Sequence, residues 1–315
     1  MHSLINRLRR RPISICGEIF GESTILSTGE VVCGCVDPLG INPLGNINQQ
    51  SIKDIFYGDK YRSLRDQILS SSNDSFCPAL SCDCCFKTLP AKDVNIRIPV
   101  IKKLTIETTS FCNLRCLDCS VPRWMSAKSP RLAKLDHRKI ERAIMDTRDD
   151  LQQISLYNYG EPFLDHDLIP LLRFIRQKTK AWIYIHTNGT IMAEGVPEII
   201  AREQLIHAIS FSIDGTYQES YERYRIGGDF EKAFNNMISI HKYKNIYKNQ
   251  YPTIIWQYIL FDWNDSEEEI KRVQELAEQY QLDVLWVATH SVGASKKYAY
   301  GSQRFKDLPG AKTFR

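Results

Sequence analysis

The sequence predicts an α/β protein, a partial (β/α)6 barrel of the TIM type preceded by a small cysteine-rich domain. From about Lys102 onward, short apolar runs typical of strands alternate with longer segments of helical period, which is the pattern of repeated βα units around a parallel sheet. All ten cysteines lie at or before Cys119. We therefore expect a cysteine-rich domain over residues 1–98, the barrel over residues 99–290 and a C-terminal tail over residues 291–315.

The first 98 residues lack the alternation of strand and helix signals. They contain a turn-rich stretch over residues 37–46 and one expected helix near residues 51–69. Because no secretion signal lies near Met1, a cytoplasmic location is expected, where thiols stay reduced and available to metals. A small segment with little apolar material needs a metal or a neighbouring domain for stability. The candidate metal ligands here are Cys16, Cys33, Cys35, Cys77, Cys82, Cys84 and Cys85.

The barrel is predicted from six strands and the helices between them. The strands are expected at residues 103–109, 153–159, 182–187, 208–214, 253–261 and 283–288. The helices are expected near residues 136–149, 165–178, 196–204, 229–248 and 266–280. Ser266 and Glu269 predict a capping box, and Asp136, Asp165 and Asp229 are expected N-caps. Six βα units are fewer than the eight of a closed barrel, so one side should stay open for a large substrate.

Composition favours a globular protein and excludes two classes of partner. Hydrophobic residues make up 43% and charged residues 25% of the chain, which is enough apolar material for a sizeable core. The net charge of +4 is too small to predict nucleic-acid binding, and the basic run around Arg9 is expected to be a solvated arm. No apolar stretch approaches the roughly 18 residues of a membrane span. We expect neither a nucleic acid nor a membrane as partner.

Three cysteines directly after the first barrel strand carry the strongest chemical signal. Cys112, Cys116 and Cys119 form a CxxxCxxC arrangement on a loop at the carboxyl end of that strand, the face on which barrel active sites lie. Three thiolates bind three irons of a 4Fe–4S cluster and leave the fourth iron open to a small ligand, which suggests catalysis. The alternative is a zinc site with a fourth ligand such as His137, although zinc sites usually distribute CxxC pairs over two segments.

This loop resembles the cluster-binding motif of the radical S-adenosylmethionine superfamily, and later segments extend the resemblance. The stretch 159–162 (YGEP) resembles the family element that receives the amino group of the methionine moiety. The stretches 186–189 (HTNG) and 212–215 (SIDG) resemble the strand-end motifs around the same ligand, and Arg225 resembles an arginine that pairs with the methionine carboxylate. With a polar residue on the fifth strand, the implied S-adenosylmethionine-binding residues are Gly160, Glu161, Pro162, Thr187, Asn188, Ser212, Asp214, Arg225 and Gln257. Asp118 departs from the family, which carries an aromatic residue just before the third cysteine.

The resemblance also implies a reaction. A reduced 4Fe–4S cluster, supplied with electrons by a donor such as flavodoxin or ferredoxin, would cleave S-adenosylmethionine to methionine and a 5'-deoxyadenosyl radical that takes a hydrogen atom from the substrate. The cofactor supplies this chemistry, so the protein positions the substrate and excludes water. No catalytic side chain is assigned.

Residues 14–90 resemble the auxiliary iron–sulfur domain called SPASM. The resemblance rests on Cys16 and on the stretches 27–35, 44–56, 61–68 and 77–85. In most relatives this domain follows the barrel, whereas here it precedes it, and the cysteine spacings fit only loosely. The seven cysteines suit one auxiliary cluster with spare thiols, which we favour, or nearly complete two clusters. A structural zinc knuckle is the alternative.

These features predict a radical S-adenosylmethionine oxidoreductase or epimerase that acts on a sugar-containing small molecule. The sugar is favoured because the cluster domain occupies the first third and leaves no separate domain for binding a leader peptide. A peptide maturase, forming a thioether, a carbon–carbon bond or a D-residue, is the nearest alternative. An alternative of another class is a zinc-binding scaffold protein without this reaction.

Overall fold

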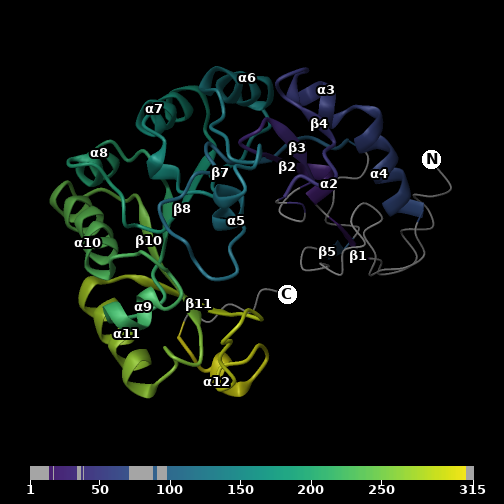
Figure 1. The fold of residues 1–315 in the computed structure, drawn as a ribbon. Coiled ribbons are helices and arrows are strands. Elements are labelled where there is room, and N and C mark those ends of the chain that lie inside the picture. Colours follow the sequence, from purple (N-terminus) through teal and green to yellow (C-terminus); the bar gives the residue numbers. More distant parts are fainter. Residues whose placement is uncertain are drawn as a thin grey trace.

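The structure, a computed structural model of the 315-residue chain, describes residues 14–16, 18–33, 37, 39–70, 88–90 and 98–309. Most of its strands lie in one nine-stranded sheet with the order β11-β10-β9-β8-β7-β6-β2-β3-β4. The strands from β6 to β11 pair in parallel with their neighbours in the sequence. Figure 1 shows the sheet curved, with helices α6, α7, α8, α10 and α11 in an arc on its outer side. The predicted α/β class and partial barrel are confirmed.

All six predicted barrel strands are present, and several are shorter than expected. They are β6 Lys103–Ile106, β7 Gln153–Leu156, β8 Trp182–Thr187, β9 Ala208–Ser212, β10 Thr253–Leu260 and β11 Asp283–Ala288. The five predicted helices are α6 His137–Thr147, α7 Leu168–Lys178, α8 Val196–Arg202, α10 Phe230–Ile246 and α11 Glu267–Tyr280. Three short helices lie in the connections: α5 Val121–Ser126, the 3₁₀ helix η4 Pro162–Leu164 and α9 Gln218–Glu222.

The barrel strands β8 and β10 present alternate apolar side chains to the helices. In β8, Ile183 and Ile185 are fully buried, whereas the intervening Tyr184 and His186 are half-buried. Since successive side chains of a strand point to opposite faces, the second pair faces the inside of the barrel.

The predicted N-caps are confirmed with one exception. The side chains of Ser266, Asp136 and Asp229 each accept a hydrogen bond from a backbone N–H of the helix that follows. The prediction for Asp165 was wrong, because α7 begins at Leu168 and Asp167 occupies its N-cap position. The carboxylate of Asp165 instead contacts two side chains near the start of α6, Lys134 at 2.9 Å and His137 at 2.6 Å.

The N-terminal segment continues the barrel sheet across the predicted boundary at residue 98. Strand β2 (Glu22–Ile25) pairs in parallel with β6, with Ile25 opposite Ile106. Strands β3 (Glu30–Val32) and β4 (Gly45–Asn46) then extend the sheet in antiparallel fashion. A separate pair is formed by β1 (Ser14–Cys16) and β5 (Thr88–Pro90).

The helices of the N-terminal segment are short. The single helix expected near residues 51–69 is divided into α3 (Ile52–Phe56) and α4 (Asp59–Ser70), and α2 (Glu18–Gly21) precedes β2. Helix α3 is followed by a tighter turn, in which the Gly58 N–H bonds the Ile55 carbonyl at 3.1 Å, and α4 begins at the next residue.

The segment after β11 packs back on the barrel, where we expected a loop or flexible tail. It includes helix α12 (Gln303–Lys306), and Phe305 and Leu308 are buried. The indole N–H of Trp286 donates to the carbonyl of Pro309 at 2.9 Å.

Among residues 14–309, in the parts of the chain that the structure describes, no helix has the length and apolar character required to cross a membrane.

Candidate functional site

A cavity of about 300 Å³ lies at the carboxyl ends of the parallel strands. Ligand sites of barrels occupy this face, because the loops after all the strands meet there. The described residues that line it are Cys112, Leu114, Cys116, Asp118, Cys119, Val121, Tyr157, Asn158, Tyr159, Gly160, Glu161, His186, Thr187, Asn188, Ser212, Tyr224, Arg225 and Gln257.

The three cysteines of the CxxxCxxC loop meet in this cavity. Backbone hydrogen bonds hold the loop in place, from Arg115 to Ile226 at 2.9 Å and from Leu117 to Tyr224 at 3.1 Å. The Cys112 sulfur accepts from the backbone N–H of Leu114 at 3.4 Å. The loop therefore rests on the segment between α9 and α10.

Burial keeps the thiols of Cys112 and Cys119 protonated when no metal is bound. It raises the pKa of Cys112 to about 12 and also raises that of Cys119 above the ordinary value. A thiolate becomes favourable at such a position only when a cation binds it. The donor set therefore suits a metal that displaces the protons.

Gly160 brings the second loop against the cysteine loop. Its φ of +83° lies in the left-handed region, and a Cβ at this position would stand 2.3 Å from the Thr109 carbonyl oxygen. The next residue, Glu161, donates its backbone N–H to the carbonyl of Phe111 at 2.8 Å. Only glycine allows this close approach.

The Glu161 carboxylate is buried and holds the loop after β8. It accepts from the Thr187 hydroxyl and the Asn188 N–H, both at 2.7 Å, and from the Phe163 N–H at 3.1 Å. Burial raises the pKa of Glu161 to about 7, although these hydrogen bonds oppose the shift. A cationic group beside the carboxylate would favour its ionised form.

The side chain of Asn188 connects this loop to the cysteines. Its amide nitrogen donates to the Asn113 side-chain oxygen at 3.0 Å and lies 3.7 Å from the Cys112 sulfur. The motif after β8 therefore contacts both the Glu161 carboxylate and the cysteine loop.

Arg225 brings a cation to the same cavity. Its Nε donates to the Asp214 carboxylate at 2.6 Å, and its Nη1 lies 3.7 Å from the Cys116 sulfur. Burial works against the charged guanidinium, but the negative charge of Asp214 outweighs it and holds the pKa of Arg225 above its ordinary value. The arginine therefore stays cationic beside the cysteines.

Two of the nine residues predicted to bind S-adenosylmethionine do not line the cavity. Pro162 begins η4, behind Glu161. Asp214 is fully buried, accepts from the Ile259 N–H at 2.7 Å and orients Arg225. The other seven line the cavity.

The inner wall also contains residues that the sequence analysis did not select as ligand-binding. Tyr157 and His186 line the cavity, and their rings lie 5.9 Å apart. His186 is hydrogen-bonded to the Ser212 hydroxyl, and burial together with the nearby Arg225 lowers its pKa to about 4, so its ring is neutral at pH 7. His186 alternates with the buried Ile183 and Ile185 of β8, so strand alternation was the signal that could have identified it, whereas Tyr157 directly follows β7.

Asp118 lies on the rim of the cavity. It has a φ of +60°, and its carboxylate accepts the backbone N–H of Val292 at 3.2 Å. The residue that departs from the family pattern therefore links the cysteine loop to the segment after β11.

Two of the seven N-terminal candidate ligands lie among the described residues. Cys16 ends β1 and is half-buried, and Cys33 follows β3 and is buried. Because β3 runs antiparallel to β2, Cys33 lies toward the sheet edge opposite the cavity. The other candidates, Cys35, Cys77, Cys82, Cys84 and Cys85, lie outside the described residues.

His137, the fourth ligand considered for a zinc site, lies elsewhere. It is hydrogen-bonded to Asp165 and does not line the cavity. Ligand atoms of His137, Asp165 and Asp167 lie within 4.8 Å of one another, but the Lys134 ammonium contacts both carboxylates at 2.9 Å. The Lys134 ammonium therefore already neutralises part of the negative charge that would attract a metal ion to these carboxylates.

Two family signatures match this chain. The family signature described as the radical SAM superfamily matches residues 106–276, more than half of the chain. The signature of SPASM, described as an iron–sulfur cluster-binding domain, matches residues 16–86, so this domain precedes the barrel as predicted.

Individual relatives are distant. The protein named GTP 3',8-cyclase from Clostridium botulinum is 24% identical over 203 residues, which cover 62% of this chain and 59% of that protein. The protein named GTPase Obg from Brachyspira hyodysenteriae is 21% identical over 196 residues, covering 60% of this chain and 28% of that protein. A solved structure described as native anSMEcpe with bound AdoMet is 19% identical, covers 59% of this chain and 50% of that chain, and has a TM-score of 0.45. This chain thus spans less than two thirds of the length of each.

Proposed function

The chain belongs to the radical SAM superfamily, and we propose that its cavity binds a 4Fe–4S cluster and S-adenosylmethionine and acts on the substrate through a 5'-deoxyadenosyl radical. One observation carries this proposal. The three cysteines Cys112, Cys116 and Cys119 share one cavity with the carboxylate of Glu161 and the guanidinium of Arg225.

The cysteines fit the cluster. Three half-buried thiols on one short loop supply three iron ligands, and the described lining offers no fourth cysteine, so one iron would stay open to S-adenosylmethionine. Arg225 beside the Cys116 sulfur offsets part of the negative charge of a thiolate-bound cluster.

The remaining charged groups fit the methionine moiety. Glu161 is a buried carboxylate that gains from a neighbouring ammonium, and Arg225 offers a guanidinium to a carboxylate. Thr187 and Asn188 hold Glu161 in place through two hydrogen bonds of 2.7 Å.

A cluster held by Cys112, Cys116 and Cys119 would supply the radical chemistry: one electron would cleave S-adenosylmethionine into methionine and a 5'-deoxyadenosyl radical, which would take a hydrogen atom from the substrate. The chain's own residues hold the reacting groups in place. Leu114 and Val121 are buried beside the cysteines and exclude water there. An electron donor such as flavodoxin or ferredoxin would reduce the cluster.

For the substrate, we favour a sugar-containing small molecule that is oxidised or epimerised. Neutral hydrogen-bonding side chains on the inner wall, Tyr157, His186 and Gln257, suit hydroxyl groups better than charged groups. A peptide maturase remains the alternative. Cys33 lies toward the sheet edge opposite the cavity. An auxiliary cluster bound there would be too far from the substrate to contact it, so an electron-accepting role fits it better than substrate binding.

The test of the radical reaction uses anaerobically reconstituted protein reduced with dithionite. We expect the wild type to form 5'-deoxyadenosine from S-adenosylmethionine and a variant with Cys112→Ala, Cys116→Ala and Cys119→Ala to form none. Cys33→Ala changes a candidate ligand of the auxiliary cluster outside the cavity, so it should lower the iron content and still form 5'-deoxyadenosine. Iron that remains in the triple variant would belong to the N-terminal domain. A wild type with a full cluster that neither binds nor cleaves S-adenosylmethionine would disprove the proposal.

The substrate is tested by adding a panel of sugars, aminosugars and sugar nucleotides to the active wild type. Product formation accompanied by faster 5'-deoxyadenosine release supports a sugar substrate. A response to a cysteine-containing precursor peptide, with none to the sugars, would favour the peptide maturase.

A further inference from the structure

A buried carboxylate that the radical reaction does not use lies between the cavity and the N-terminal segment. Glu107 follows β6 directly, and its side chain is completely buried. Its Oε2 atom forms an ion pair with Arg131 at 2.6 Å, and the Arg131 side chain is itself only 8% exposed. A buried ion pair is costly to desolvate, so it must be held by further hydrogen bonds.

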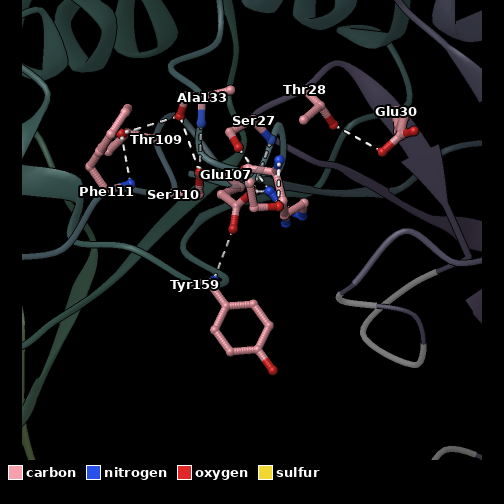
Figure 2. Close-up of polar contacts among 11 residues, drawn as sticks. Ser27, Thr28, Glu30, Glu107, Thr109, Ser110, Phe111, Ala133 and Tyr159 are labelled. Carbon is pink, nitrogen blue, oxygen red and sulfur yellow. Dashed lines mark hydrogen bonds and ion pairs between the residues drawn. The ribbon is translucent and has the colours of Figure 1, made fainter. Parts of the chain in front are cut away.

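The two oxygens of Glu107 serve different parts of the molecule. Oε2 accepts the backbone N–H of Ser27 at 2.9 Å, and Oε1 accepts the backbone N–H of Tyr159 at 3.0 Å. Figure 2 shows Glu107 between these two residues, with Tyr159 reaching away from the N-terminal turn. One carboxylate therefore fixes two backbone segments that lie 132 positions apart in the sequence, from 27 to 159.

On the cavity side, Glu107 and its partner hold both the backbone and the ring of Tyr159. The Arg131 guanidinium lies 4.9 Å over the Trp124 ring, and that ring makes an edge contact of 4.9 Å with the ring of Tyr159. Tyr159 lines the cavity and directly precedes Gly160 and Glu161. Its position determines where these two residues enter the cavity.

On the other side, the same pair holds the turn between β2 and β3. The Glu107 N–H bonds the Ile25 carbonyl at 2.9 Å, and the Arg131 guanidinium donates to the Ser27 hydroxyl at 2.9 Å. The turn is closed by the Leu26 N–H, which bonds the Glu30 carbonyl at 2.8 Å. The turn belongs to the segment matched by the SPASM signature.

We propose that Glu107 is a positioning residue that holds the S-adenosylmethionine-binding loop at Tyr159 in register with the N-terminal iron–sulfur domain at Ser27. This inference rests on the proposed function, since it assigns S-adenosylmethionine to the cavity. Besides binding an auxiliary cluster, the N-terminal domain would then support the ligand site. Its turn at Ser27 and the cavity wall at Tyr159 share the Glu107 carboxylate as acceptor, so a more mobile turn would make the ligand site more mobile as well.

The test compares Glu107→Gln with Glu30→Gln in the anaerobically reconstituted full chain. A glutamine has a single acceptor oxygen, so Ser27 or Tyr159 loses its acceptor and Arg131 loses its counter-charge. Glu30 is the matched control, because its carboxylate accepts from the Thr28 hydroxyl at 3.0 Å on the same turn (Figure 2). We expect Glu107→Gln to raise the Kd for S-adenosylmethionine about tenfold, as replacing supporting hydrogen-bond partners typically does at metal sites. Glu30→Gln should leave the Kd unchanged.

Two readouts separate positioning from general destabilisation. The electron paramagnetic resonance spectrum of the reduced cluster should shift with S-adenosylmethionine in the wild type and Glu30→Gln and shift less in Glu107→Gln, at equal iron content. Hydrogen exchange should accelerate in Glu107→Gln in both residues 22–30 and residues 156–163. Acceleration in only one of these segments would overturn the proposed link.

A second variant keeps the proposal testable if Glu107→Gln fails to fold. Glu107→Gln combined with Arg131→Met removes both buried charges at similar volume, which proteins often tolerate. We expect it to fold and still show the raised Kd, because the two N–H groups still share one acceptor. A folded variant with wild-type Kd and spectrum would refute the role of Glu107. Absence of S-adenosylmethionine binding by the wild type would instead refute the proposed function.

Discussion

Gly160 lies where backbone conformation and close packing both require a glycine. Its φ is +83°, and a Cβ would stand 2.3 Å from the carbonyl oxygen of Thr109 and 2.8 Å from the Ser110 Cα. These contacts are backbone atoms of the loop that carries the cysteines. A side chain here would separate Glu161 from the cysteine loop.

We expect Gly160→Ala to lower the rate of 5'-deoxyadenosine formation about 100-fold, because a displacement of about 1 Å in an active site has this effect. Gly195→Ala is the matched control. Gly195 also has a positive φ, +79°, but among the described residues no atom beyond its chain neighbours lies within 4 Å of the place that a Cβ would take. That change should cost about 1 kcal/mol of stability through backbone strain and leave the rate unaffected. Equal losses of rate in both variants would show that packing against the cysteine loop is unimportant.

At the scale of elements, helix α11 forms only one of the two hydrogen bonds of the predicted capping box. Ser266 caps the helix by accepting the Glu269 N–H at 3.1 Å, as the capping box predicts. The Glu269 carboxylate does not return to the cap. It accepts the Thr216 N–H at 3.0 Å and the Tyr258 hydroxyl at 3.3 Å, and so joins α11 to the loop after β9.

Ser266→Ala should lower the free energy of unfolding by about 1 kcal/mol, since it removes the acceptor of one N–H at the helix start. Glu278→Ala, an exposed position in the same helix, should change it by less than about 0.5 kcal/mol. Denaturant titration of both variants against the wild type measures the difference. A cap variant as stable as the control would mean that tertiary contacts through Glu269 alone fix the helix start.

At the scale of the whole molecule, the sheet is completed at both ends by segments outside the six βα units. The N-terminal β2 pairs with β6 at one end of the barrel, and the segment after β11 packs at the other. In that segment, Ser295 donates its hydroxyl to the Asp265 carboxylate at 2.6 Å, and Lys297 forms an ion pair with the same residue at 3.1 Å. Both segments contact residues of the cavity. The N-terminal one does so through Glu107, which also binds the Tyr159 N–H, and the C-terminal one through the bond from the Val292 N–H to Asp118.

If the last segment is part of the folded core, Phe305→Ala should destabilise the protein by about 3 kcal/mol, the cost of a cavity at a buried phenylalanine. Phe305 is 1% exposed, whereas Tyr300, five positions earlier, is 45% exposed. Tyr300→Ala should therefore cost less than about 0.5 kcal/mol. Thermal unfolding of the two variants tests this, and equal transitions would place the segment outside the core.

The sequence by itself determined the six strands, the five helices of the barrel, most of their caps and the family. These depend on local patterns, since alternate apolar residues and capping side chains act within a few positions of one another. The motif residues that line the cavity were also predictable, because the carboxyl ends of parallel strands meet at one face.

Only the tertiary structure decided which side chains support these motifs. Glu107 and Arg131 are buried polar residues whose partners are distant in sequence, and no local pattern indicates which of many polar residues will be brought together. Asp165 illustrates the same limit, since its carboxylate is bound by Lys134 and His137 rather than used as a cap. The pairing of β2 with β6 was equally hidden, because strand partners are chosen by long-range packing and not by the strand's own residues.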